Sequence, residues 1–147
     1  PRMLQSYQGN AKQKYLQTFR ELTLSTVLMS VVLAAFIWLV TPLIIGWLDK
    51  PVYTEYLDQL VFLIAVGFMF AVGHIPHYAL YAMKGDKWIL LAHVSALLVF
   101  FLSLMLLNRA SAFEAVALSL LLAFSWMALI KTIGYFHTRQ HSKLLKN

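Results

Sequence analysis

Cysteine is absent from this sequence and acidic residues are scarce, and each absence excludes a kind of site. Without cysteine the chain can form no disulfide and offers no thiolate to a metal. Only six of the 147 residues are Asp or Glu, and all of them lie at or beyond the end of an apolar stretch. Clustered aspartates for a metal, paired carboxylates, a Ser-His-Asp set and a glycine-rich phosphate loop are all missing. We therefore expect no catalytic residue, no metal site and no cofactor, in a protein that is not an enzyme.

Hydrophobic residues make up 61% of the chain, charged residues make up 12%, and the mean hydropathy is +0.71. Four apolar stretches, each long enough to cross a bilayer as a helix, lie at about residues 22–48, 59–83, 88–107 and 113–136. The runs are continuous, whereas a strand of a membrane barrel alternates. The sequence thus predicts an all-α integral membrane protein: a lead-in over 1–21, a four-helix transmembrane segment over 22–137 and a basic tail over 138–147.

The end of the lead-in has the pattern of a short amphipathic helix at the membrane surface. Asn10 can cap such a helix, and one of its faces is apolar. That face holds Tyr15, Leu16, Phe19 and Leu22. A plain continuation of the first span is an equally good interpretation.

The twelve basic residues are distributed unevenly among the loops, and this distribution predicts the topology. Ten lie before the first span, between the second and third, or at the end of the chain: Arg2, Lys12, Lys14, Arg20, Lys84, Lys87, Lys131, Arg139, Lys143 and Lys146. Only Lys50 and Arg109 lie in the other two loops. By the positive-inside rule both termini are cytoplasmic, with Arg20, Lys84, Lys87 and Arg139 as interfacial anchors. The net charge of +6 therefore reflects topology and does not indicate a nucleic-acid partner.

The ionisable residues inside the spans are His74, His77, His93 and Lys131. The rise of a helix places His77, His93 and Lys131 each about 9 Å into the membrane from the same side, with His74 one turn deeper. We expect these basic groups to form a positive ring that binds an anionic headgroup, with histidine adding titration near neutral pH. Alternatively, each histidine bonds a backbone carbonyl and Lys131 extends to the lipid headgroups.

A resemblance to a known family rests on three segments. The run PHYALYAMKGDKWILLAHVSALLVFFLSLMLLN is similar to a helix, an "L-x-A-x-G-K/D-x-K" turn and a following helix near the end of polysaccharide flippases. The segments PRMLQSYQGNAKQKYLQTFREL and TPLIIGWLDKPVYTEYLDQLVFLI resemble the flanking loop and joining segment there. The sequence departs from that pattern at Asp49-Lys50-Pro51 and at ASAFEAVALS.

These flippases belong to the multidrug/oligosaccharidyl-lipid/polysaccharide exporter superfamily. The resemblance implies that this chain is the last four of about twelve helices in a transporter of two lobes, which expose a central cavity to each side in turn. It implies a multi-pass protein of the bacterial inner membrane that flips undecaprenyl-diphosphate-linked oligosaccharide for polysaccharide or O-antigen assembly. The partners are then the lipid bilayer, the lipid-linked oligosaccharide and the missing N-terminal helices, and Pro1 is a cut point.

Two other functions remain open from the residues alone. A redox membrane anchor could bind haem between helices through His74 or His77 together with His93. A small membrane scaffold would need no substrate at all. Small four-helix multidrug exporters are excluded, because they use a carboxylate buried in the first span and this chain has none there. A metal held by His74 and His77 alone would have an incomplete ligand shell.

Overall fold

The computed structural model describes residues 12–55, 57–107 and 111–141, and these residues form helices without any strand. The elements are α2 (Lys12–Leu48), α3 (Pro51–Glu55), η1 (Leu57–Gln59), α4 (Leu60–Val72), α5 (His74–Ala82), α6 (Asp86–Leu106) and α7 (Ala112–His141). Four stretches of this described part are long and apolar enough to cross a membrane: Gln13–Leu48, Val52–Ala82, Asp86–Leu106 and Ala112–His141. The prediction of an all-helical chain with four potential spans is confirmed.

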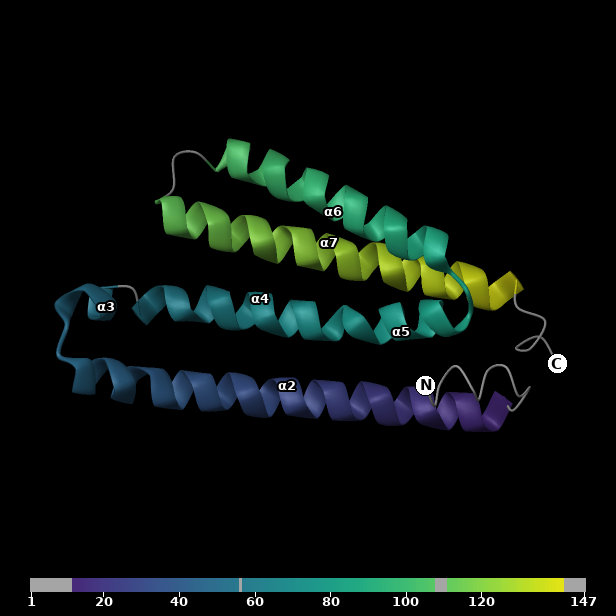
Figure 1. Ribbon diagram of the computed structural model, residues 1–147, viewed down its shortest axis with the longest axis horizontal. Helices are drawn as coiled ribbons and strands as arrows, with labels where there is room; N and C mark the ends of the chain where they lie inside the picture. Colours follow the sequence, from purple (N-terminus) through teal and green to yellow (C-terminus); the bar gives the residue numbers. More distant parts are fainter. Residues whose placement is uncertain (1–11, 56, 108–110, 142–147) are drawn as a thin grey trace.

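The helices lie side by side in an order that differs from their order in the chain (Figure 1). Helix α7 packs against α6 on one side and against α4 and α5 on the other, while α2 contacts α4. The last span is therefore inserted between the second and the third. The start of α2, the end of α5, the start of α6 and the end of α7 all lie at one end of the bundle, which we call the basic end because it carries Lys14, Arg20, Lys84, Lys87 and Arg139.

The central position of α7 follows from a stripe of buried residues at every fourth position. This stripe consists of Ala115, Ser119, Ala123, Met127, Lys131 and Tyr135. Small side chains let helix backbones approach closely in a membrane, where apolar burial alone does not drive association. Helix α6 offers the matching pair Ala92 and Ala96, also buried and also four residues apart.

At Gly134, helix α7 lies directly against Trp88 of α6. A Cβ atom at this glycine would lie 2.5 Å from Cγ and 2.6 Å from Cβ of Trp88. These atoms belong to the base of the indole side chain and cannot move without moving α6. Gly134 therefore fixes the distance between the two helices.

The turn between α5 and α6 closes as a Schellman motif, in which two backbone N–H groups satisfy the last carbonyls of the helix. The N–H of Gly85 donates to the carbonyl of Leu80 at 2.8 Å, and that of Lys84 donates to the carbonyl of Tyr81 at 3.2 Å. Lys84 occupies the left-handed position with φ 57°, which usually favours glycine. The turn lies at Lys-Gly-Asp-Lys, between the second and third predicted spans.

The second span is divided at Gly73 into α4 and α5. Pro76 follows within the first turn of α5 and has no N–H, so the carbonyl of Val72 loses its intrahelical partner. The break directly precedes the two histidines of this span.

Helix α2 begins before the predicted first span, and helix α7 ends after the predicted last span. Residues 12–21 belong to α2, which runs unbroken into the first span, so the continuous alternative describes this part. Its apolar face packs on other helices: Tyr15 is fully buried against α5 and α7, and Phe19 and Leu22 pack beside it and are partly buried. Leu16, by contrast, is exposed. At the other end α7 continues to His141, so residues 138–141 extend the last helix, while residues 1–11 and 142–147 lie outside the described part.

Candidate functional site

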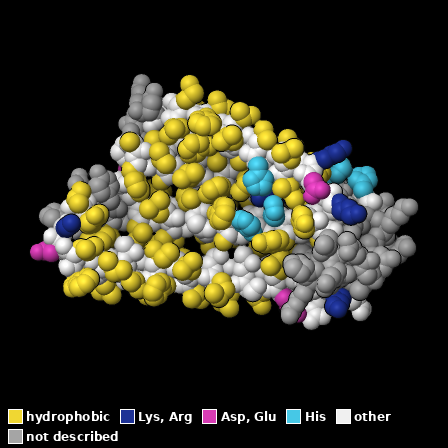
Figure 2. Space-filling view, in the orientation of Figure 1, with side chains coloured by type: hydrophobic (Ala, Val, Ile, Leu, Met, Phe, Trp, Pro, Cys, Tyr) yellow, Lys and Arg dark blue, Asp and Glu magenta, His cyan; other side chains and the backbone are white. Residues whose placement is uncertain are grey.

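The structure brings three of the predicted site residues together where α5 faces α6. The ring centroids of His77 and His93 are 6.0 Å apart, and those of His77 and His74 are 5.8 Å apart. Histidine side chains gather on this face of the bundle around a basic side chain (Figure 2). His77 stands in the middle of the group, with one histidine from its own helix and one from the neighbouring helix.

Two of these histidines use one ring nitrogen to bond their own helix. Nδ1 of His74 donates to the carbonyl of Phe70 at 2.8 Å, and Nδ1 of His93 donates to the carbonyl of Ile89 at 2.7 Å. Because a carbonyl accepts, the proton of each neutral ring is at Nδ1 and Nε2 keeps its lone pair. The expectation of carbonyl-bonded histidines is thus met at these two positions.

His77 differs from its two neighbours. Its Nδ1 is buried, and it has no hydrogen-bond partner within the described part of the chain. A buried polar nitrogen without a partner is uncommon and points to a bond made with something else. His77 is therefore the member of the group whose hydrogen bonding the described residues leave incomplete.

Lys131 approaches the histidines from α7, where it belongs to the buried stripe. Its side chain is only 1% exposed, so it does not extend to the headgroups as the alternative interpretation expected. Its ammonium group lies close enough to His77 for their charges to interact. Lys131 forms no ion pair with any described carboxylate, since those lie at the helix ends.

Two aromatic residues that the sequence interpretation did not name also contribute to the group. Tyr78 lies 5.7 Å from His77 and 6.1 Å from His74, measured between ring centroids. Phe70 packs edge-on against His74 at 4.6 Å. Both follow from helical spacing, because Phe70 precedes His74 by four residues and Tyr78 follows it by four.

The four predicted interfacial anchors lie at the basic end. Arg20, Lys84 and Lys87 are exposed there, as an anchoring role requires. Arg139 is half-buried instead, at the edge of a groove between α2, α5 and α7.

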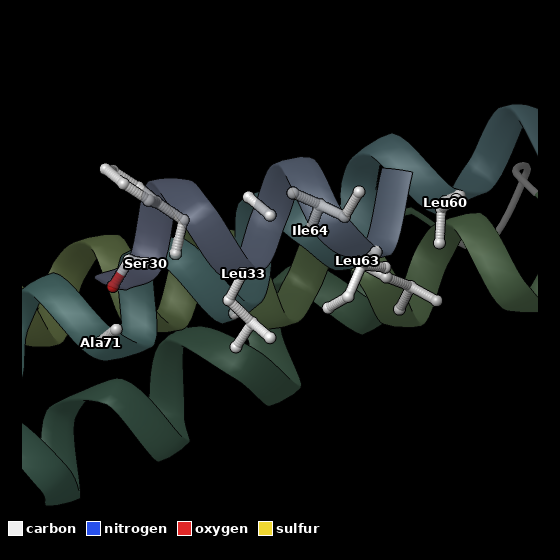
Figure 3. A pocket seen from close by; sticks show the side chains of 10 residues that line it. Ser30, Leu33, Leu60, Leu63, Ile64 and Ala71 are labelled. Atoms are coloured by element: carbon white, nitrogen blue, oxygen red, sulfur yellow. The ribbon is translucent and has the colours of Figure 1, made fainter. Parts of the chain in front are cut away.

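An apolar groove of about 290 Å³ lies between α2 and α4. Leu33 from α2 and Leu63 and Ile64 from α4 line it, and small residues such as Ala71 leave it open (Figure 3). Its one hydroxyl, Ser30 Oγ, donates to the carbonyl of Thr26 at 2.7 Å. Because this hydroxyl is already bonded to its own helix, the lining of the groove is apolar.

Among residues 12–55, 57–107 and 111–141, no group of three or more His, Cys, Asp or Glu side chains is placed to hold a metal ion. Comparisons with protein-family models, with curated proteins and with solved structures found no match to this chain. The four apolar helices are consistent with a multi-pass membrane protein.

Proposed function

We propose that this chain is the C-terminal part of a transporter that flips undecaprenyl-diphosphate-linked oligosaccharide across the bacterial inner membrane for polysaccharide or O-antigen assembly. The proposal combines the resemblance of the three sequence segments with the basic site between α5, α6 and α7. We place the basic end on the cytoplasmic side of the membrane, because it carries most of the described Lys and Arg residues. Both termini and the turn at Gly85 are then cytoplasmic.

The observation that carries the proposal is a buried lysine beside His77, with no described carboxylate to pair with it. Lys131 is 1% exposed, His77 lacks a partner for Nδ1 in the described structure, and the described residues supply no anion to either. An ionisable group inside a membrane segment is costly unless it has a partner or faces a polar pathway. An anionic diphosphate supplies that partner, and it receives hydrogen bonds from the amine and from protonated imidazoles.

The position of the site suits entry from the cytoplasm. His77, His93 and Lys131 lie five to ten residues from the helix ends at the basic end, within about 15 Å at 1.5 Å per residue. When the diphosphate of a lipid-linked oligosaccharide enters there, the sugar of that molecule faces the water and its hydrocarbon tail stays in the bilayer. Protonated histidines favour the anion and neutral ones release it, which links export to a proton gradient.

The transporter needs more helices than this chain provides. The two lobes of such a transporter move against each other to expose the site alternately, and four helices supply no second lobe. Large apolar side chains of α2 are open on its surface, with Leu43 72% and Trp47 87% exposed. We propose that lipid and the missing N-terminal helices cover them. The 147-residue chain by itself is expected not to flip a lipid-linked sugar in vesicles.

The test uses the full-length parent transporter in cells that depend on it for polysaccharide export. His77→Gln, His93→Gln and Lys131→Ala are each expected to lower export at normal protein level, whereas Lys87→Ala, at an exposed position of the same end, leaves export unchanged. If all three site variants accumulate and export as well as the parent, the group serves only as interfacial packing and the proposal fails.

One observation also fits the haem alternative. His77 and His93 come from the second and third spans with ring centroids 6.0 Å apart, and Nε2 of His93 keeps its lone pair in the neutral tautomer described above. Two such histidines are the ligand set that a membrane haem uses. The purified chain would then show a Soret band that His93→Ala removes, and a spectrum without that band after reconstitution with haem excludes this function.

A further inference from the structure

A second groove, of about 330 Å³, lies between α2, α5 and α7 at the basic end of the bundle. Its walls include Phe19 and Thr23 from α2, Ile75 and Pro76 from α5, and Ala128 and Arg139 from α7. It is separate from the histidine group, with which it shares no residue. The volume is at the lower end of the range for small-molecule pockets, enough for part of one hydrocarbon chain.

The inner part of the groove presents hydrocarbon to its occupant. The hydroxyl of Thr23 donates to the carbonyl of Phe19 at 2.9 Å, and that of Thr132 donates to the carbonyl of Ala128 at 2.7 Å. Both hydroxyls are thus engaged by their own helices. Ile75, Pro76 and the stacked rings of Phe19 and Tyr135, 5.4 Å apart, complete an apolar wall.

The outer end of the groove is cationic. Arg139 lies in the last turn of α7, eleven residues after Ala128, which is about 16 Å along the helix. Its side chain is half-buried and forms no ion pair with a described carboxylate, and no Asp or Glu lines the groove. A guanidinium above an apolar groove at the membrane surface matches one kind of ligand: an anionic headgroup attached to a hydrocarbon chain.

We propose that this groove binds one anionic phospholipid of the leaflet that faces the basic end. One acyl chain lies between α2, α5 and α7, and the headgroup phosphate accepts hydrogen bonds from Arg139. The bound lipid fills the space between the first span and the rest of the bundle and holds α2 against α5 and α7. This site does not depend on the proposed transport function.

Native mass spectrometry of the purified full chain, released from neutral detergent, tests the proposal with phosphatidylglycerol and phosphatidylcholine of identical acyl chains. The wild-type chain is expected to retain phosphatidylglycerol preferentially. A basic side chain near an anionic headgroup contributes about 1 kcal/mol, so Arg139→Gln should reduce the preference about fivefold. Arg139→Lys should restore most of it, and Arg20→Gln, an exposed arginine at the same end outside the groove, should leave it unchanged.

A second variant tests the apolar part. Thr132→Leu adds hydrocarbon volume inside the groove and should weaken retention of both lipids while keeping the ratio between them. The proposal is overturned if the wild-type chain retains both lipids equally. It is also overturned if Arg20→Gln and Arg139→Gln reduce the preference by the same factor, because the preference would then arise from the general charge of the basic end.

Discussion

Replacing Lys131 with methionine should stabilise the folded chain and at the same time reduce transport. Methionine has a similar length and flexibility and carries no charge, so it can occupy the same place in the buried stripe of α7. The lysine has no ion-pair partner among the described residues, and its replacement therefore leaves no described carboxylate unpaired. Functional sites often contain residues that lower the stability of the fold, because the function needs their chemistry.

The size of the effect follows from burial and depth. A lysine at the centre of a membrane helix costs ~2.5–3.5 kcal/mol on insertion scales. Lys131 lies six residues before residue 137, the predicted end of the transmembrane segment, which is about 9 Å by helical rise and so between the centre and the interface. We expect a gain of roughly 1–2 kcal/mol for Lys131→Met, about half of the central value.

Unfolding in mixed micelles with a rising fraction of a denaturing detergent, followed by helical circular dichroism, measures this gain. Lys131→Met should move the midpoint to a higher denaturant fraction. Lys87→Met is the matched control, because Lys87 is exposed at the start of α6, and it should leave the midpoint within about 0.5 kcal/mol of the wild-type value. The same Lys131 variant in the full-length parent should export poorly.

The opposite result would refute the reasoning. If Lys131→Met lowers stability by more than about 1 kcal/mol, the chain itself supplies hydrogen-bond acceptors that the ammonium satisfies. The lysine would then be a structural residue, and the argument that it awaits an external anion would lose its main support.

Three further predictions concern the turns, the packing and the topology. Gly134→Ala should destabilise the chain by about 1–3 kcal/mol, because the added methyl group meets the base of the indole on α6. Gly67→Ala, where a Cβ meets nothing within 4 Å, should be neutral or stabilising by up to about 1 kcal/mol in the same unfolding assay. Lys84→Gly should stabilise by about 1 kcal/mol by relieving the left-handed backbone, whereas Lys84→Ala should not. Single cysteines at exposed Lys87 and Ser111 should react with an impermeant thiol reagent from the cytoplasmic and the external side, respectively.

Each of these has a result that would count against it. Equal stability of the two glycine variants would mean that α6 and α7 separate at no cost. If Lys84→Ala stabilised the chain as much as Lys84→Gly, the gain in stability would come from loss of the lysine charge and not from relief of the left-handed backbone. Labelling of the Lys87 variant from outside would reverse the orientation, and with it the assignment of the site to the cytoplasmic mouth.

The spans were predictable because the length of each hydrophobic run can be counted in the sequence. The four stretches at about 22–48, 59–83, 88–107 and 113–136 all fall within the observed helical spans or next to their ends. The ends were less predictable: the polar sequence at 12–21 continues α2, and α7 runs on to His141, because a helix need not stop at the membrane surface. Bilayer thickness limits apolar length and leaves the helix free to extend into water.

The lateral order of the helices was not predictable in the same way. In a membrane the outer and inner faces of a helix are both apolar, so hydrophobicity does not tell which face meets another helix. One pattern did carry the information: Ala115, Ser119 and Ala123 recur at every fourth residue, and Lys131 continues that series. If this repeat is taken as the packing face of the helix, it predicts that Lys131 lies inside the bundle. The alternative interpretation, extension of Lys131 to the headgroups, is then disfavoured. The common level of His77 and His93 was predictable from helical rise alone.

The most direct test of the central claim is the transbilayer movement of a diphosphate-linked lipid sugar in vesicles that contain the full-length parent protein. We expect the parent to move the lipid and the double variant His77→Gln with Lys131→Met to lose most of this activity, although the variant is folded and at least as stable. Movement of the lipid by the double variant at the parental rate would contradict the assignment of these residues to the anionic headgroup.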